Sequence, residues 1–102
     1  MDAVKLQALR ELDRDILAFV RGMQKHAPVT EESIYEFIVG PRRRRVTIDD
    51  IRDRIIYLLN AKHLEARGNW KDGAELVEYT ITADGMDLLD GNIPPRNWKP
   101  RF

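Results

Sequence analysis

The first chemistry that this sequence suggests lies in a run of four arginines, residues 42–45, which a single residue, Val46, separates from Thr47. Neighbouring guanidinium groups repel one another, so the run contributes little to folding by itself. The tetrad Thr47-Ile48-Asp49-Asp50 is a close variant of a capping box and predicts a helix N-terminus, where free backbone N–H groups attract anions. Planar guanidinium forks beside such a helix end suit phosphate groups. The expected phosphate contacts are Arg42, Arg43, Arg44, Arg45, Thr47 and Arg52.

The charge distribution supports this interpretation. The chain has 17 basic and 17 acidic residues, but residues 41–71 hold nine basic and four acidic side chains. The flanking segments 1–40 and 72–102 are both net acidic. A basic middle between acidic ends steers a polyanion to one surface. Two alternatives for the arginine run stay open, namely a solvated charged loop and a nuclear-localisation patch.

Catalysis, metals and cofactors find no support in the residue pattern. The chain has no cysteine, which excludes disulfides, thiolate zinc sites and a cysteine nucleophile. His26 and His63 stand 37 residues apart without a catalytic motif around them. Asp49, Asp50 and Asp53 lack the loop and the spacing of an EF-hand. We expect a protein that is not an enzyme and that binds no cofactor and no metal.

Length and composition predict one domain with a single core. The 102 residues are 43% apolar and 33% charged, which is a globular composition. The longest apolar run, residues 55–59, is far shorter than the roughly 20 residues that cross a bilayer. The N-terminus does not resemble a secretory signal. We therefore expect a cytoplasmic protein with no membrane association.

Periodicity predicts which elements position these residues. Helical spacing in the first helix predicts one buried stripe, with Asp13 mostly outside it; the stripe consists of Leu9, Leu12, Ile16, Phe19 and Met23, widened by Leu17 and Val20. The same spacing places Lys62 with the buried face of the third helix, and Met86 and Leu89 are expected to point inward from the last helix.

Alternation with a two-residue period begins after His63. Asp72-Gly73 predicts a hairpin turn, and Thr30, Thr47 and Thr82 each predict a helix N-cap. The predicted helices cover residues 3–25, 31–39, 48–61 and 83–90, the strands cover 64–70 and 75–81, and an extended proline-rich tail covers 92–102.

This order of elements resembles the winged helix-turn-helix proteins. The stretch Tyr79-Thr80-Ile81-Thr82-Ala83-Asp84-Gly85-Met86-Asp87-Leu88-Leu89 is similar to their junction between the second wing strand and the last helix. Residues 55–67 are similar to their third helix running into the first wing strand. The resemblance covers roughly residues 13–90. It implies an α+β fold, with a three-helix core, a two-stranded β-hairpin wing and a short C-terminal helix. It also implies that the third helix and the wing contact DNA.

The resemblance adds three candidate contacts to the arginine run. Lys71, at the tip of the wing, could meet a phosphate, and Arg67 could reach a minor groove. Tyr57, on the outward arc of the third helix, could touch a base edge or a phosphate. Plain solvent exposure is the alternative for all three residues.

Two features depart from the pattern of the family. The connection from Val39 to Val46 is longer than the roughly three- to four-residue turn of a compact helix-turn-helix. Asp49, Asp50 and Asp53 also lie on the outward face of the third helix, where carboxylates near phosphates are unfavourable. We therefore expect that this helix either does not enter a groove along its whole length or does not enter DNA at all.

Two functions follow as hypotheses. The first is a duplex DNA-binding protein, either a small transcriptional regulator or a phage-type accessory protein, that forms a homodimer through the first helix or the tail. The second is a protein-interaction module that uses the acidic face of the third helix or the tail residues Trp98 and Phe102. These two aromatic residues are the candidate partner-binding anchors, although they could also fold back on their own domain.

Overall fold

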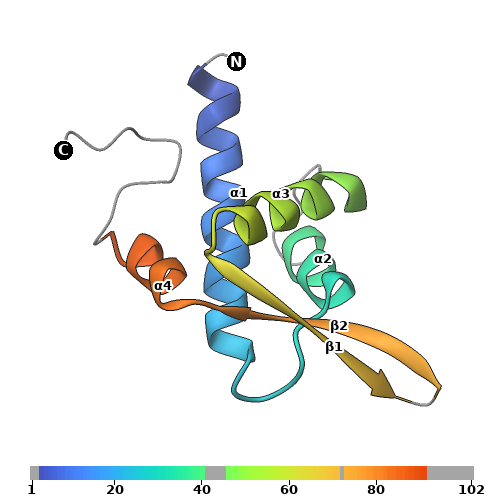
Figure 1. The fold of residues 1–102 in the computed structure, drawn as a ribbon. Helices are drawn as coiled ribbons and strands as arrows, with labels where there is room; N and C mark the ends of the chain where they lie inside the picture. Colours follow the sequence, from blue (N-terminus) through green and yellow to red (C-terminus); the bar gives the residue numbers. More distant parts are fainter. Residues whose placement is uncertain (1–2, 41–45, 72, 92–102) are drawn as a thin grey trace.

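The computed structural model describes residues 3–40, 46–71 and 73–91, which form four helices and a two-stranded antiparallel hairpin (Figure 1). Each element lies within two residues of its predicted bounds. In chain order the elements are α1 (Ala3–Met23), α2 (Glu31–Val39), α3 (Ile48–Asn60), β1 (Leu64–Lys71), β2 (Ala74–Ile81) and α4 (Ala83–Leu89).

α1 is the central helix, because it packs against α2, α3, α4 and β2. The predicted buried stripe was only partly right. Leu12 and Ile16 are buried as expected, but Met23 is 38% exposed. Asp13, expected outside the stripe, is only 8% exposed. Leu17 and Val20, which were expected to widen the stripe, are fully buried. A helix with neighbours on several sides buries a wider surface than one amphipathic stripe, and here that surface extends to Asp13.

The helix starts follow the predicted caps. Thr30 and Thr82 each accept a hydrogen bond from the third backbone N–H that follows, as N-cap residues do. At the other end of α3 the structure corrects one expectation. Lys62, which helical periodicity placed with the buried face of that helix, lies beyond it, is exposed and has φ 68°. The N–H groups of Lys62 and His63 donate to the carbonyls of Leu59 and Leu58, which is a Schellman ending.

The hairpin pairs Leu64 with Ile81 at its base and Lys71 with Ala74 at its end. Gly73, in the connecting turn, has φ 79°, a left-handed conformation that glycine adopts without strain. The outer edge of β2 is covered near its base. There the Tyr79 N–H donates to the Val29 carbonyl at 2.8 Å, and the Ile81 N–H donates to the Gln24 side-chain oxygen at 2.9 Å. These two hydrogen bonds pair backbone N–H groups that would otherwise lack a partner at the edge of the sheet.

α4 is held close to the hairpin base by its first turn, where Gly85 lies. A Cβ added at Gly85 would overlap the His63 carbonyl and approach Ile81 Cγ1 to 2.7 Å, so the backbones meet directly there. Leu89 is buried as predicted, whereas Met86, predicted to point inward, is 37% exposed. The Arg21 guanidinium binds the Asp90 carboxylate at 2.8 Å and links α1 to the end of α4.

The arrangement separates two sides of the molecule (Figure 1). α1 runs through the middle, and α4 lies to its left. α3, α2 and the hairpin extend to its right, with the hairpin reaching furthest from α1. The buried cluster draws residues from α1, α2, α3, both strands and α4. Among the described residues, no helix has the length and apolar character of a membrane span.

Candidate nucleic-acid interface

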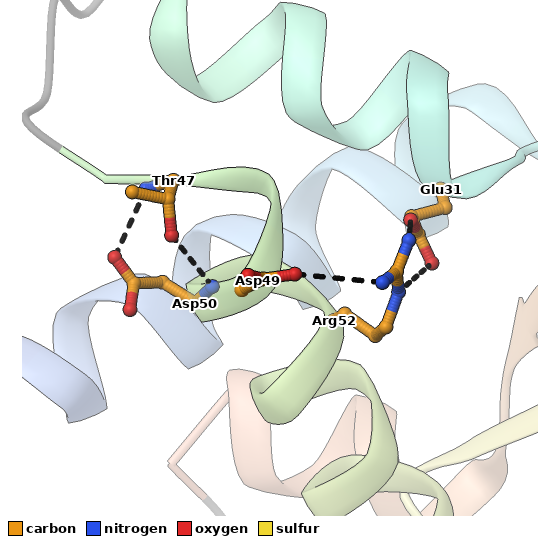
Figure 2. A network of polar contacts seen from close by, with 5 residues as sticks. All are labelled: Glu31, Thr47, Asp49, Asp50 and Arg52. Carbon is orange, nitrogen blue, oxygen red and sulfur yellow. Dashed lines mark hydrogen bonds and ion pairs between the residues drawn. The ribbon is translucent and has the colours of Figure 1, made fainter.

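The N-terminus of α3 is built by the capping box that the sequence predicted (Figure 2). Thr47 Oγ1 accepts the Asp50 N–H at 3.1 Å, and Asp50 Oδ2 accepts the Thr47 N–H at 2.9 Å. Both side chains are exposed. A threonine hydroxyl that accepts one bond keeps its own proton for a further acceptor. The cap therefore leaves Thr47 able to donate to an anion at this helix end.

Arg52 lies one turn further along α3 and is held by two carboxylates (Figure 2). Its Nε and Nη2 donate to Glu31 Oε2 and Oε1 at 3.2 and 2.8 Å, and its Nη1 donates to Asp49 Oδ1 at 3.4 Å. Glu31 belongs to the first turn of α2, so this fork joins the two helices. Hydrogen bonding to Glu31 is the main cause that raises the pKa of Arg52 above its ordinary value.

The acidic residues Asp49, Asp50 and Asp53 of α3 differ in their partners within the chain. Asp50 belongs to the helix cap and Asp49 approaches Arg52, so two of the three carboxylates have partners within the chain. Asp53 is exposed on the same helix. Asp49 therefore has a cationic partner and Asp50 serves the helix cap, but this face of α3 keeps a net negative charge because Arg52 is shared with Glu31.

A second ion pair, which the sequence analysis missed, fixes α3 against α1. Arg54 Nε and Nη2 donate to Asp13 Oδ1 and Oδ2 at 2.8 and 2.7 Å, and the Asp13 and Arg54 side chains are 11% and 20% exposed. Burial raises the pKa of Asp13, and the hydrogen bond from Arg54 opposes that rise. The same hydrogen bond raises the pKa of Arg54. The signal in the sequence was an acidic residue, Asp13, next to the apolar positions of α1, together with Arg54 on another predicted helix. These two features could have predicted the ion pair.

Tyr57 differs from its predicted setting on the outward arc. Its ring is half-buried against the core, and the Arg54 guanidinium carbon lies 4.3 Å from the ring centroid. This stacking occupies one face of the ring. The exposed residues of α3 are instead Asp49, Asp50, Arg52, Asp53, Ile56 and Asn60. Ile56, at 49% exposure, is a large apolar residue on that surface that the sequence analysis did not single out.

The hairpin places the other predicted contacts. Arg67 is exposed on β1 and lies opposite Glu78 of β2 in the register, and Lys71 is the last residue of β1. At the hairpin base, Tyr79 is buried close to the Glu31–Arg52 pair. Burial first, and then the Glu31 charge, raises the pKa of Tyr79, while Arg52 lowers it. The pair thus lies where α2, α3 and β2 come together.

Several predicted site residues lie outside the described part of the chain. They are Arg42, Arg43, Arg44, Arg45, Trp98 and Phe102. The helices on either side of the arginine run are described: α2 ends at Val39 and α3 begins at Ile48. The connection is therefore longer than a compact helix-turn-helix turn, as expected. In the parts of the chain that the structure describes, no three His, Asp or Glu residues form a metal-binding group.

Comparison with known proteins identifies the fold. No family model and no curated protein matches the sequence. Solved structures do match the structure, including the following two. A PadR-like transcription factor from Bacteroides fragilis superposes with a TM-score of 0.72 and 19% identity, over 89% of this chain and 85% of that chain. The Bacillus subtilis PadR in complex with operator DNA superposes with a TM-score of 0.68 and 16% identity, over 92% of this chain and 52% of that chain.

The chain has a winged helix-turn-helix fold. This confirms the predicted fold class, with β1 and β2 as the wing and α1, α2 and α3 as the helical core. Both the wing and α3 extend from α1 toward the side away from α4 (Figure 1). α3 and the hairpin thus lie on the same side of α1.

Proposed function

We propose that this winged-helix protein binds duplex DNA without catalysis and acts as a small transcriptional regulator. The observation that carries the proposal is the superposition on a PadR that was solved with operator DNA. Both structural neighbours are described as PadR or PadR-like, and one of them as a transcription factor, which favours a regulator over a phage-type accessory protein. The excess of basic residues in the segment 41–71 adds an independent electrostatic reason.

The proposed phosphate contacts surround the start of α3. Thr47 is exposed and caps that helix with its hydroxyl, and the arginine run ends two positions before Thr47 in the chain. Arg67 and Lys71 belong to the wing strand that extends to the same side. Phosphate contacts of this kind set the position of a protein on the duplex and carry no sequence information.

We also propose that the protein acts as a homodimer, because two copies would read a two-fold symmetric site with one wing and one α3 each. α1 is the first candidate for the dimer contact, since its N-terminal end extends past the other elements (Figure 1). The tail is the second candidate.

Salt-dependent binding tests the proposal. Fluorescence anisotropy of a labelled random-sequence duplex, titrated with the full chain at about 50 to 200 mM salt, should give a log–log slope of about −3 to −4 per chain if three or four phosphates are neutralised. Replacing Arg43 and Arg44 together by alanine should weaken binding to all sequences alike and flatten the slope by about 2. An unchanged affinity in this double variant would contradict the assignment of the contacts.

The matched control removes the same charge from the other side of the molecule. Arg14 and Arg21 lie two turns apart on α1, and Arg21 binds Asp90 next to α4, on the side opposite the wing. Arg14→Ala combined with Arg21→Ala should leave the salt slope unchanged. If the wild-type chain shows no salt-dependent retention of duplex at all, the interaction-module hypothesis replaces DNA binding.

A further inference from the structure

We propose that Arg52 reads guanine in the major groove and that Glu31 is the positioning residue that holds its guanidinium for this task. The inference rests on the proposed DNA-binding function and deepens it, because it separates one sequence-reading residue from the phosphate contacts. It also revises the expectation that Arg52 contacts a phosphate.

The first argument is the place of Arg52 on α3. Its side chain is 53% exposed and lies on the helix surface that also carries Ile56 and Asn60. In helix-turn-helix proteins the N-terminal part of such a helix contacts base edges. Arg52 lies in the second turn of α3, after a cap that Thr47 and Asp50 complete between themselves. It is therefore in the part of the helix that approaches bases first.

The second argument is the geometry of the guanidinium. A guanidinium has five N–H donors in one plane. Glu31 takes the side edge, formed by Nε and Nη2, with both carboxylate oxygens. Asp49 accepts from Nη1 at 3.4 Å, a long contact from a side chain that is 79% exposed. Each terminal nitrogen therefore keeps one N–H. The edge formed by the two terminal nitrogens matches the O6 and N7 acceptors of guanine.

The third argument is electrostatic and decides between a base and a phosphate. One cation here faces two carboxylates, and a third, Asp53, is exposed on the same helix. A phosphate brought to Arg52 would gain little attraction and would meet this negative charge. A guanine edge offers two neutral acceptors, so it takes the directional hydrogen bonds without that repulsion. The same carboxylates that make Arg52 a weak phosphate contact leave it suited to a base.

The fourth argument concerns Glu31 as the fixed partner. Its side chain is 26% exposed, about half the exposure of Arg52, and it lies in the first turn of α2, where the helix dipole favours a carboxylate. The buried Tyr79 lies close enough to sense its charge. Glu31 thus belongs to the packed junction of α2, α3 and the wing, and the plane of the Arg52 guanidinium is fixed relative to the fold before DNA arrives. Such preorganisation favours directional contacts.

Selection from a duplex pool tests the inference. The purified full chain is used to enrich duplexes with a randomised centre, and the bound fraction is sequenced for the wild type and for the variants Arg52→Ala, Arg52→Lys and Glu31→Gln. The wild type should enrich guanine at one or more positions. In Arg52→Ala and Arg52→Lys that enrichment should fall by roughly tenfold at the same position and persist elsewhere, since a lysine cannot form the planar fork. Glu31→Gln should lower it less.

The salt dependence of duplex binding separates a base contact from a phosphate contact at Arg52. Under the inference, Arg52→Ala leaves the salt slope unchanged, because no phosphate contact is lost. A uniform loss of affinity with a slope flattened by about 1 would make Arg52 a phosphate contact and overturn the inference, with the proposed function intact. Tighter binding of Glu31→Gln to all sequences, or a full guanine preference in Arg52→Lys, would also overturn it.

Two controls keep these results separate. Arg14→Ala removes an exposed arginine of α1 and should leave the selected sequences unchanged. Thermal unfolding followed by circular dichroism shows that each variant is folded before it is used. If the wild-type chain binds no duplex in a salt-dependent way, the proposed function fails, and the inference about Arg52 fails with it.

Discussion

At the scale of the residue, Lys62 shows the cost of one backbone conformation. It takes the left-handed position of the Schellman ending of α3, with φ 68°. That region costs an L-amino acid about 1–2 kcal/mol, whereas glycine adopts it freely. Lys62→Gly should therefore raise the free energy of unfolding by about 0.5–1 kcal/mol, after the greater flexibility of glycine in the unfolded chain is deducted. Thermal unfolding by circular dichroism should show a melting temperature a few degrees higher.

The control for this prediction is another exposed lysine. Lys25 follows α1, and Lys62 is the one residue other than glycine that has positive φ in the described ranges. Lys25→Gly should be neutral or destabilising, because no strain is relieved there. A loss of stability in Lys62→Gly would show that the lysine side chain makes a stabilising contribution larger than the backbone strain.

At the scale of the element, the Asp13–Arg54 pair joins α1 to α3. Arg54→Met leaves the Asp13 carboxylate buried without its cation, which should cost roughly 3 kcal/mol or more. The double variant Asp13→Leu with Arg54→Met replaces the pair by apolar side chains and should return to within about 1 kcal/mol of the wild type. Urea unfolding of the four proteins gives the double-mutant cycle.

The exposed pair between Arg21 and Asp90 is the matched control, since it joins α1 to the end of α4 with side chains 42% and 52% exposed. Arg21→Met should cost less than about 1 kcal/mol, as exposed ion pairs do. If Arg54→Met cost no more than Arg21→Met, the buried pair would not be what fixes α3 against α1.

At the scale of the whole molecule, the burial of Asp13 makes the stability of the fold depend on pH. Its pKa in the folded chain lies above the ordinary 3.8. When the pH rises from below 3.8 to above the pKa of Asp13 in the folded chain, Asp13 loses its proton in the unfolded chain first. Over that range the folded state binds more protons than the unfolded state, so the free energy of unfolding falls as the pH rises. The free energy of unfolding of the wild type minus that of Asp13→Asn should therefore be larger at about pH 3 than at about pH 7. Urea unfolding of both proteins at the two pH values measures this difference.

Glu36→Gln is the matched control, because it removes one exposed carboxylate from α2. The same trend with pH in this variant would assign the effect to net charge instead of Asp13. A relative stability of Asp13→Asn that rises toward acid would contradict the sign of the Asp13 shift.

The sequence by itself determined the features that depend on near neighbours. The caps at Thr30, Thr47 and Thr82 involve a residue three positions away, and the turn at Gly73 involves adjacent residues. Hydrogen bonds of this range are set by residue type and spacing, so the sequence alone predicts them. The alternation in the strands and the helical apolar pattern likewise predicted the winged-helix order.

Only the tertiary structure decided which distant side chains meet. Arg52 and Glu31 are 21 positions apart, and Arg54 and Asp13 are 41 apart. Periodicity assigns each of these residues to a helix face, but the partner depends on how two helices cross, which local propensity does not encode. This is why Asp13 was predicted to be exposed and is buried, and why Arg52 was assigned to phosphate before its carboxylate partner on α2 was known. The packing of helices onto α1 converted separate charged positions into fixed pairs.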